Sequence, residues 1–216
     1  MVADGSLDAF RRDRRRLLES LQTAGISDLA ILHAFDEAPR HHFVPAELHT
    51  RAYEDAALPI GHGQTISRPS VHALHLELAR IRAGDRVLEV GTGSGFQTAL
   101  IALLGASVYS IEVVRELSAE AGRRLVELGI EAELRVGDGG EGWPAQAPFD
   151  AILVGAAAPS VPGALLAQLA EGGRLVIPVG VGGEQTLYRY RREGGDILQE
   201  TVSDARFVPL VGDDRG

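Results

Sequence analysis

Short, almost wholly apolar runs in the middle of the chain are each followed by a segment whose apolar positions recur every three or four residues. Apolar runs of this length are typical of strands buried on both faces, and the longer period is typical of helices. Their regular alternation with short connections predicts a parallel sheet covered by helices on both faces. Strands are expected at residues 86–90, 107–112, 132–137 and 173–180 and at the start of 149–158, and helices at 95–105, 114–129 and from Pro162 to about Leu169.

The chain ahead of this alternation has a different pattern. A helix is expected at residues 7–24, closed by Gly25, and a second one runs from a cap at Ser27 to a stop at Pro39. Proline, glycine and histidine then punctuate residues 40–67. This composition indicates irregular structure with a short strand or two.

Another helix is expected to begin at Pro69, and residues 185–192 and 196–210 are interpreted as two strands joined by a Glu-Gly-Gly turn. The helix carries one apolar stripe, formed by Val71, Leu74, Leu78 and Ile81. The terminal strands add an antiparallel edge to the sheet. We therefore predict an α/β fold: a doubly wound, mostly parallel sheet with N-terminal helices and an antiparallel C-terminal strand pair.

Composition narrows the class of protein. The 216 residues are 45% hydrophobic and 24% charged, as expected for one soluble globular domain, and no apolar run approaches the roughly 18 residues of a membrane span. The first residues have no apolar region of a secretory signal. We therefore expect a cytoplasmic protein without a membrane partner, and we also expect it to be a monomer.

Charged and reactive side chains exclude further classes. Without cysteine, the chain forms neither disulfides nor cysteine-based metal sites, and without lysine it has no lysine-based catalysis. A net charge of −9 argues against a nucleic-acid partner. A basic run, Arg11, Arg12 and Arg14–Arg16, suggests either a patch for an acidic partner or the solvated face of an amphipathic helix. The second interpretation is favoured because apolar residues accompany the run at helical spacing, namely Phe10, Leu17, Leu18 and Leu21.

The sequence VLEVGTGSGF takes a buried strand directly into a glycine-rich turn and then a helix. Gly91, Gly93 and Gly95 allow a tight turn and close approach of a ligand to the backbone. A dinucleotide-binding turn needs its third glycine where this chain has Phe96. The pattern fits instead the glycine turn of S-adenosylmethionine-dependent methyltransferases, with S-adenosyl-L-methionine as the cofactor.

Acidic residues follow at matching intervals. Glu112 ends the second strand, where a carboxylate is placed to accept hydrogen bonds from both ribose hydroxyls. Asp138, followed by Gly139, ends the third strand within reach of the adenine amino group. Glu89 has three open interpretations: it supports the turn, binds the methionine amino group or points out of its strand.

The chain resembles the protein-L-isoaspartate (D-aspartate) O-methyltransferases over most of residues 40–210. The GHGQTIS stretch within residues 52–69 carries the most specific match, since the glycine turn is shared by many methyltransferases. The N-terminal helices match only loosely. The matching pieces are FVP (43–45), AYEDAALPIGHGQTISRP (52–69), VLEVGTGSGFQTA (87–99), GDG (137–139), APFDAILVGAAAP (147–159), QLAEGGRLVIPVG (168–180) and RFVPL (206–210).

This resemblance implies a Rossmann-like class I methyltransferase that repairs proteins. It would esterify the α-carboxylate of L-isoaspartyl residues and would also act on D-aspartyl residues. The ester would collapse to a succinimide that hydrolyses partly to normal aspartate. The family's active-site serine corresponds to Ser67. The cofactor residues implied are Thr65, Ile66, His72, Gly91, Thr92, Gly93, Ser94, Gly95, Glu112, Asp138 and Gly139, with Glu89 as a further candidate. Within one domain, residues 1–68 would form the substrate-side segment, 69–180 the cofactor-binding core and 181–216 the terminal strands.

The expected chemistry needs no general base, because a carboxylate is already ionised at neutral pH. Accordingly, no serine–histidine–acid motif and no metal-ligand cluster is recognised. Ser67 is expected to donate a hydrogen bond to the acceptor carboxylate, although serine before Pro69 is also common as a helix-entry residue. The segment 206–210 is expected to return to the site, with an ordinary edge strand as the alternative. No role is assigned to four histidines, His41, His42, His62 and His75.

Other functions are compatible with parts of the pattern. A related O-methyltransferase could esterify a normal aspartate in a dedicated peptide, and it would keep the same core motifs. A non-catalytic cofactor-binding protein is disfavoured by the intact glycine turn, both acids and Ser67. An NAD-dependent oxidoreductase is disfavoured by Phe96 and by the absence of a hydride-site motif.

Overall fold

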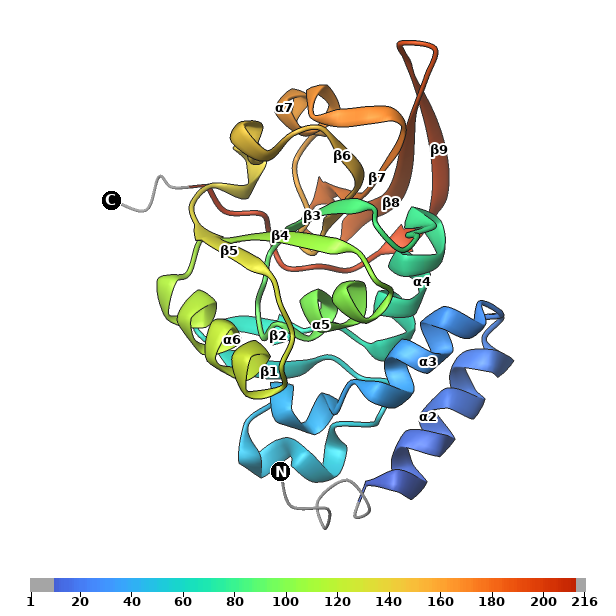
Figure 1. Cartoon of the computed structure of the whole chain (residues 1–216), viewed down its shortest axis with the longest axis vertical. Helices are drawn as coiled ribbons and strands as arrows, with labels where there is room; N and C mark the ends of the chain where they lie inside the picture. The colour runs from blue at the N-terminus through green and yellow to red at the C-terminus, as the bar shows by residue number, and fades with distance from the viewer. Residues whose placement is uncertain (1–9, 213–216) are drawn as a thin grey trace.

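Seven strands form one sheet in the computed structural model, which describes residues 10–212 (Figure 1). Their order across the sheet is β5-β4-β3-β6-β7-β8-β9. The strands from β5 to β7 run parallel, whereas β8 is antiparallel to both β7 and β9, as predicted. Their bounds are β3 Arg86–Val90, β4 Ser107–Glu112, β5 Glu133–Val136, β6 Phe149–Val154, β7 Leu169–Val181, β8 Glu184–Glu193 and β9 Asp196–Ala205.

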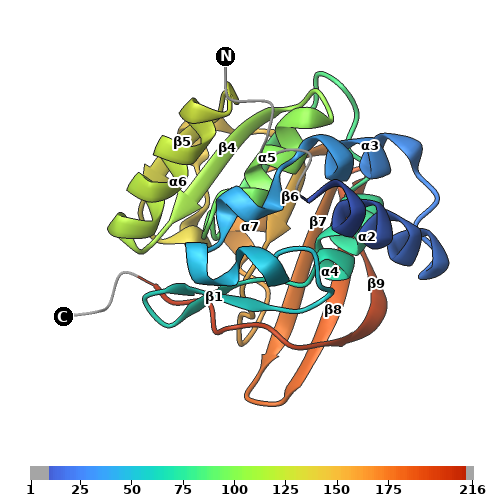
Figure 2. The same ribbon diagram turned by 90° about the horizontal axis from the view of Figure 1, so that it is seen from below.

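Alternate strand residues pack into two separate hydrophobic clusters, one on each face of the sheet. Val87 and Val108 belong to the cluster that includes buried side chains of five helices, α2 to α6, and Figure 2 shows α2 to α5 on this side. Leu88 and Ile111 belong to the cluster under α7. The helices are α2 Arg11–Thr23, α3 Leu29–Glu37, α4 Pro69–Ala79, α5 Phe96–Leu103, α6 Arg115–Glu127 and α7 Gly163–Ala167, and the 3-10 turns are η1 Arg40–Phe43, η2 Ala46–Arg51, η3 Gly139–Glu141 and η4 Pro144–Gln146.

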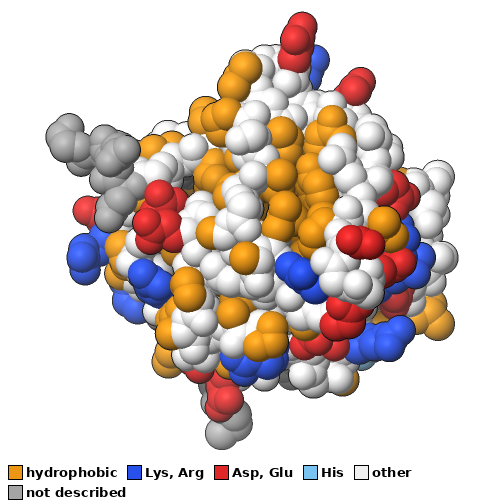
Figure 3. Space-filling model, turned by 90° about the horizontal axis from the view of Figure 1, so that it is seen from above, with side chains coloured by type: hydrophobic (Ala, Val, Ile, Leu, Met, Phe, Trp, Pro, Cys, Tyr) orange, Lys and Arg blue, Asp and Glu red, His pale blue; other side chains and the backbone are white. Residues whose placement is uncertain are grey.

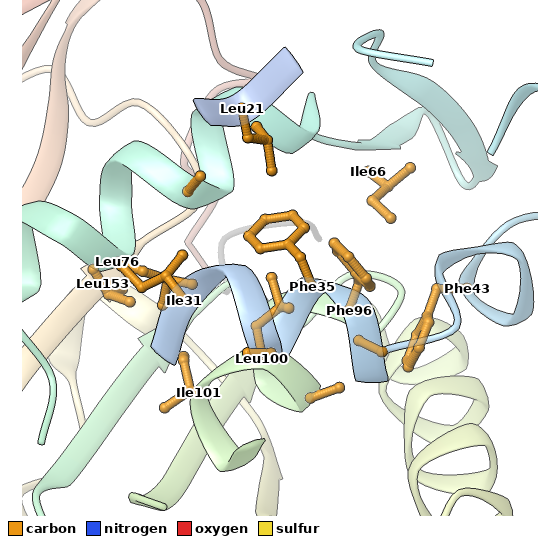
Figure 4. Packing of buried hydrophobic residues seen from close by; sticks show 14 of the residues in the cluster. Leu21, Ile31, Phe35, Phe43, Ile66, Leu76, Phe96, Leu100, Ile101 and Leu153 are labelled. Carbon is orange, nitrogen blue, oxygen red and sulfur yellow. The ribbon is translucent and has the colours of Figure 1, made fainter. Parts of the chain in front are cut away.

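Aromatic rings anchor the N-terminal helices to the sheet. The centroid of the Phe96 ring, at the start of α5, lies 5.8 Å from that of Phe35 and 5.4 Å from that of Phe43. Figure 4 shows these rings lying toward one another, with Ile66 from the neighbouring hairpin beside them. The hairpin consists of β1 (Leu58–Gly61) and β2 (Gln64–Ile66), which are the short strands predicted in the irregular region. This packing places the hairpin beside the turn that follows β3.

The α7 side of the sheet is covered less completely. Figure 3 shows hydrophobic side chains gathered in a hollow near the middle of the face seen from above, with charged side chains around it. The second cluster is bordered by partly buried apolar side chains, among them Val161, Leu166 and Tyr188. Within residues 10–212, no helix is both long and apolar enough to cross a membrane.

The helices before β3 form as predicted, with two corrections. The first concerns α4, which ends at Ala79, before Ile81 of the predicted stripe, and buries Ala73 and Leu76 more deeply than Val71, Leu74 and Leu78. The second concerns the cap of α3. Asp28, not Ser27, caps α3: its Oδ1 accepts hydrogen bonds from the backbone N–H groups of Ala30 (2.8 Å) and Ile31 (3.4 Å). The backbone N–H of Ser27 instead donates to Glu77. The arginine run lies on α2, which buries Leu17 and Leu21, so the amphipathic-helix interpretation is confirmed. Residues 7–9 of the predicted helix lie outside the described residues.

The C-terminal half differs from the prediction in three boundaries. The helix α7 ends at Ala167 rather than near Leu169, because Leu169 already pairs with Phe149 of β6. For the same reason β7 begins earlier than residue 173. The last strand ends at Ala205 rather than 210. Beyond Ala205 the side chain of Gln185, rather than the backbone of β8, forms the hydrogen bonds. It accepts one from the N–H of Phe207 (2.7 Å) and donates one to the C=O of Phe207 (3.0 Å).

Candidate active site

The carboxyl end of β3 leads into the predicted glycine turn. The φ angles of Gly91, Gly93 and Gly95 are 93°, 54° and 89°, in the left-handed region that disfavours side chains. Gly95 is also the N-cap of α5, where an added Cβ would lie 3.2 Å from Cβ of Ala121. The turn therefore requires glycine for its conformation, and it presents bare backbone at the edge of the sheet. Together with Ile111 it lines a cavity beside β4, called here the β4-side cavity.

Glu112, at the end of β4, is tied to this turn. Its Oε2 accepts a hydrogen bond from the N–H of Gly93 (2.8 Å), and its Oε1 accepts one from the N–H of Val114 (2.9 Å). The residue is only 6% exposed and lines the β4-side cavity. Each carboxylate oxygen has two lone pairs, so each retains capacity for another donor. Two hydroxyl groups of a ligand would match that capacity.

Asp138 and Gly139 follow β5 and have different roles in the local structure. The Oδ1 atom of Asp138 accepts a hydrogen bond from the N–H of Gly140 (2.7 Å), which caps η3. Gly139 lines the β4-side cavity, and a Cβ there would overlap Cγ1 of Val90. The space beside Gly139 is so narrow that a single methyl group would fill it. Such a space fits a flat ring that approaches the backbone closely. The side chain of Asp138 is half-buried beside Gly212.

The two polar residues inside the turn use their side chains within the protein. Thr92 Oγ1 lies 2.6 Å from Ser110 Oγ, and Ser94 Oγ accepts a hydrogen bond from the N–H of Phe96 (3.3 Å). Both residues are buried and line the second cavity described next. Their hydroxyl groups therefore stabilise the turn.

A second cavity, beside α4, collects buried polar atoms that lack partners. His72 Nε2, His75 Nε2 and Glu89 Oε1 have no hydrogen-bond partner among the described residues, and all three residues line this α4-side cavity. His72 is held through Nδ1, 3.0 Å from Oε1 of Gln97. Glu89 is held through Oε2, which accepts from Thr98 (2.5 Å) and Ser110 (2.7 Å). Leaving such groups unpaired is costly, so the cavity fits a ligand with donor and acceptor groups of its own.

Burial controls the protonation of these groups. It raises the pKa of Glu89 to about 7, an effect that the hydrogen bonds from Thr98 and Ser110 oppose. It lowers the pKa of His72 to about 3 and that of His75 to about 4. Both imidazoles are therefore neutral near pH 7, while Glu89 is close to its midpoint and responds to a nearby cation.

The hairpin forms the opposite wall of both cavities. Thr65 lines the β4-side and α4-side cavities as well as a groove of about 570 Å³, and Ser67 lines the α4-side cavity and the groove. Ile66 also lines the α4-side cavity, but its side chain is 3% exposed and packs in the core. His62 lies in the hairpin turn at a φ of 52° and is exposed. The predicted site residue Thr65 thus lies where the two cavities and the groove meet, and Ser67 lies between the α4-side cavity and the groove.

The predicted return of residues 206–210 to the site is confirmed, and the edge-strand alternative is wrong. Ala157 donates its N–H to the C=O of Val208 (2.8 Å) and accepts from the N–H of Leu210 (2.7 Å). The Phe207 ring stacks on His75, with centroids 5.3 Å apart. Phe207 and Val208 line the groove, together with Arg68, Val71, Gln185 and Arg206.

Several residues at the site were not identified from the sequence. Gln97 holds His72, His75 borders the α4-side cavity, and Arg40 binds the main chain of Ser67. No periodicity marks these positions, because each is polar in a segment whose burial arises from tertiary packing. Of the other unassigned histidines, His41 is buried with Nδ1 2.8 Å from the Tyr53 hydroxyl. No group of three or more potential metal ligands occurs within residues 10–212.

Comparison with known proteins gives consistent matches. The family model of protein-L-isoaspartate(D-aspartate) O-methyltransferase matches residues 12–215. The proteins named protein-L-isoaspartate O-methyltransferase from Hahella chejuensis and Roseiflexus castenholzii are 50% and 48% identical over 206 and 204 residues. These alignments cover 94% of this chain in both cases, and 97% and 94% of the two relatives.

Solved structures agree with the sequence matches. One protein-L-isoaspartate O-methyltransferase superposes with a TM-score of 0.84 at 31% identity, covering 93% of this chain and 66% of that one. A Plasmodium falciparum protein described as a protein-L-isoaspartate O-methyltransferase, crystallised with S-adenosyl-L-homocysteine, gives a TM-score of 0.82 at 28% identity, covering 92% and 98%.

Proposed function

Because this chain belongs to the protein-L-isoaspartate(D-aspartate) O-methyltransferase family, we propose that it methylates the free carboxylate of damaged aspartyl residues in proteins, with S-adenosyl-L-methionine as methyl donor. This group is the α-carboxylate of an L-isoaspartyl residue and the side-chain carboxylate of a D-aspartyl residue. One observation carries the proposal. The β4-side cavity, the α4-side cavity with its unsatisfied polar groups and an open groove meet at Thr65, and Ser67 lies between the α4-side cavity and the groove. A donor in the cavities and an acceptor in the groove would therefore face each other there.

The cavities fit the parts of the cofactor. Glu112 would accept hydrogen bonds from the ribose hydroxyls, and Asp138 with Gly139 would border the adenine. In the α4-side cavity, Glu89 Oε1 would accept from the methionine ammonium, and the neutral ring of His72 would donate to its carboxylate through Nε2. Gly91 to Gly95, Thr65 and Ile66 would enclose the rest by main-chain contacts. When bound, S-adenosyl-L-methionine supplies a methyl group on a positively charged sulfur.

The chain's own residues would act mainly by positioning. The acceptor carboxylate is ionised at neutral pH, so no residue has to remove a proton from it. Ser67 Oγ–H would donate a hydrogen bond that aims one carboxylate oxygen toward the cavity. Val71 and Phe207 line both the groove and the α4-side cavity, where they would exclude water and weaken the solvation of the two charges. The main chain of 206–210 would bind the peptide backbone.

The product would be a methyl ester of the isoaspartyl residue. Attack of the following backbone nitrogen on the ester carbonyl would release methanol and form a succinimide. Water would then open this ring partly to normal aspartate, which completes the repair. We further propose that the chain acts as a cytoplasmic monomer and a single domain, without a nucleic-acid partner or a metal. Its net charge of −9 and its lack of cysteine support this proposal.

A paired-substrate assay tests the proposed function. The purified protein is incubated with methyl-labelled S-adenosyl-L-methionine and either an isoaspartyl peptide or the identical peptide with normal aspartate. We expect label, as base-labile methyl ester, only in the isoaspartyl peptide. Label in the aspartyl peptide alone would mean that the protein is a related O-methyltransferase that esterifies normal aspartate. Label in neither peptide would refute the proposed reaction.

A further inference from the structure

Arg40 is a completely buried arginine at the start of η1, beside the groove wall. Its Nε–H donates to the C=O of Ala52 (2.7 Å), and its Nη2 donates to the C=O of Ser67 (2.8 Å). The third nitrogen, Nη1, has no hydrogen-bond partner among the described residues. The guanidinium therefore bridges two segments that are 15 residues apart, and one of its two anchors is the proposed active-site serine.

The same guanidinium touches the cofactor side of the molecule. Its Cζ lies 4.8 Å from the centre of the Phe96 ring, the first residue of the helix that follows the glycine turn. A cation over an aromatic face is attracted to it, and arginine stacks there well. Arg40 thus connects the main chain of Ser67 to the start of α5 by two direct contacts.

No carboxylate neutralises Arg40 within ion-pair distance among the described residues. The carboxylate with an electrostatic effect on Arg40, that of Asp55, binds Arg68 (2.6 Å) and Ser70 (2.9 Å) instead. Burial lowers the pKa of Arg40 to about 9, so the group is still charged near neutral pH. A buried cation without an ion pair is expensive to maintain, and neutral donors would suffice to tie two carbonyl groups. The unpaired, buried charge of Arg40 therefore indicates a role beyond stabilising the loop.

We propose that Arg40 is a positioning residue for the acceptor, which holds the main chain of Ser67 in register with the cofactor-binding turn. It acts through Ser67, so this inference rests on the proposed function. The bridge from Ala52 to Ser67 limits movement of the chain that carries the serine hydroxyl, and the stack on Phe96 limits movement of that chain relative to α5. If the Ser67 hydroxyl moved by a fraction of an ångström, it would no longer orient the acceptor carboxylate correctly toward the methyl group.

Arg174 provides a matched control at the opposite end of the sheet. It also ties two carbonyl groups, donating to Ala79 (2.6 Å) and Arg80 (2.5 Å). Unlike Arg40, it is only partly buried and forms an ion pair with Asp85 (3.3 Å). Arg174 lines neither the two cavities nor the groove. Replacing either arginine by lysine keeps the charge but removes the fork that reaches two acceptors. Loss of such a clamp is expected to lower the melting temperature in both variants.

A double-mutant cycle separates positioning from stability. In Arg40→Lys, we expect kcat on the isoaspartyl peptide to fall about tenfold, with the Kd for S-adenosyl-L-homocysteine within about threefold of the unmodified protein. Arg174→Lys should keep kcat within about twofold. Because Arg40 acts through Ser67, Arg40→Lys/Ser67→Ala should be no more than about twofold slower than Ser67→Ala alone. Fully multiplicative losses, or an equal loss of kcat in Arg174→Lys, would overturn the proposal.

A second measurement needs no variant. In the unmodified protein labelled with ¹⁵N-arginine, the Nε–H resonance of Arg40 should shift when the isoaspartyl peptide joins the S-adenosyl-L-homocysteine complex. The Arg174 resonance should stay in place. If the Arg40 resonance does not shift when the peptide binds, the proposed positioning role of Arg40 is refuted. This holds even if Arg40→Lys fails to fold. The unmodified protein's own activity on the peptide reports separately on the proposed function, since every variant is compared with that value.

Discussion

The two halves of the site are built in different ways. The cofactor half consists of the carboxyl ends of β3, β4 and β5, where Gly91, Glu112 and Gly139 lie at or just after the ends of strands in fixed parallel register. The acceptor half consists of segments outside that parallel core, the hairpin with Ser67 and the return segment 206–210. Side-chain bonds from Arg40 and Gln185 hold these segments in place. The sheet therefore determines where the donor lies, whereas scattered tertiary contacts determine where the acceptor lies.

This difference makes substitutions in the two halves separable. A change in the cofactor half should alter the Kd for S-adenosyl-L-homocysteine, and a change in the acceptor half should alter kcat on the peptide. The largest effect is expected for Glu112→Ala. It removes a carboxylate that accepts hydrogen bonds from Gly93 and Val114 and that would accept the ribose hydroxyls. Hydrogen bonds to a charged group contribute about 1.5–3 kcal/mol each, so the Kd measured by calorimetry should rise at least about 100-fold.

The exposed Glu133 of β5 serves as the control for this prediction. Glu133→Ala removes a carboxylate from the neighbouring strand without touching either cavity, and its Kd should stay within about twofold. A Kd for Glu112→Ala within about threefold of the unmodified protein would contradict the ribose assignment.

The next effect is expected in the acceptor half. Ser67→Ala deletes the hydroxyl proposed to orient the acceptor carboxylate, so kcat should fall about 10- to 30-fold, in line with one lost hydrogen bond to a charged group. The Kd for S-adenosyl-L-homocysteine should change by less than about twofold, the reverse of the pattern for Glu112→Ala. Ser20→Ala, on the outer face of α2, controls for the loss of a hydroxyl. An unchanged kcat would assign the orientation to the backbone amides instead.

The same contrast explains how much was predictable from the sequence. Strand–helix alternation and the spacing from Gly91 to Glu112 indicated the parallel core and the cofactor half, because both depend on periods and intervals within single segments. The position of Ser67 depended on family resemblance. Taken alone, GHGQTIS is a polar segment that precedes a helix. Nothing within it indicates which distant turn it lies against.

The residues that escaped prediction share a physical reason. Arg40 and His75 are polar residues whose burial arises only when separate segments pack, so neither has a periodic signal. The C-terminal boundaries failed for a related reason. A side chain, Gln185, ends the pairing of β9 from the neighbouring strand, and early pairing with Phe149 ends α7. Neither the end of β9 nor the end of α7 can be predicted from the propensities of the local sequence.

Titration of Glu89 should give a smaller effect in the cofactor half. Burial raises its pKa to about 7, so the carboxyl is mostly protonated at pH 6 in the free protein. An ammonium group bound at Oε1 favours the ionised form, so binding releases a proton and strengthens as pH rises. We expect the Kd for S-adenosyl-L-homocysteine to fall about tenfold between pH 6 and pH 8. In Glu89→Gln this dependence should be absent, and Glu133→Gln should retain it. A dependence that survives in Glu89→Gln would contradict the assignment.

His75 lies where the two halves touch, with its ring against Phe207 of the return segment and its free Nε2 in the α4-side cavity. Burial lowers its pKa in the folded protein to about 4. Between that pKa and about 6.5 the unfolded chain binds a proton that the folded chain does not. The free energy of unfolding should therefore decrease as pH falls from about 6.5 to 4.

His75→Gln removes this titration, so the loss of stability between pH 7 and pH 4.5 should shrink by on the order of 2 kcal/mol in urea unfolding. Part of the loss should remain, because the pKa of the buried His72 is lowered in the same way. His33→Gln, an exposed histidine on α3, should follow the unmodified protein. Equal losses in all three proteins would mean that His75 takes up its proton while folded, which requires the Phe207 segment to open. The acceptor half would then loosen at low pH before the sheet that carries the cofactor half unfolds.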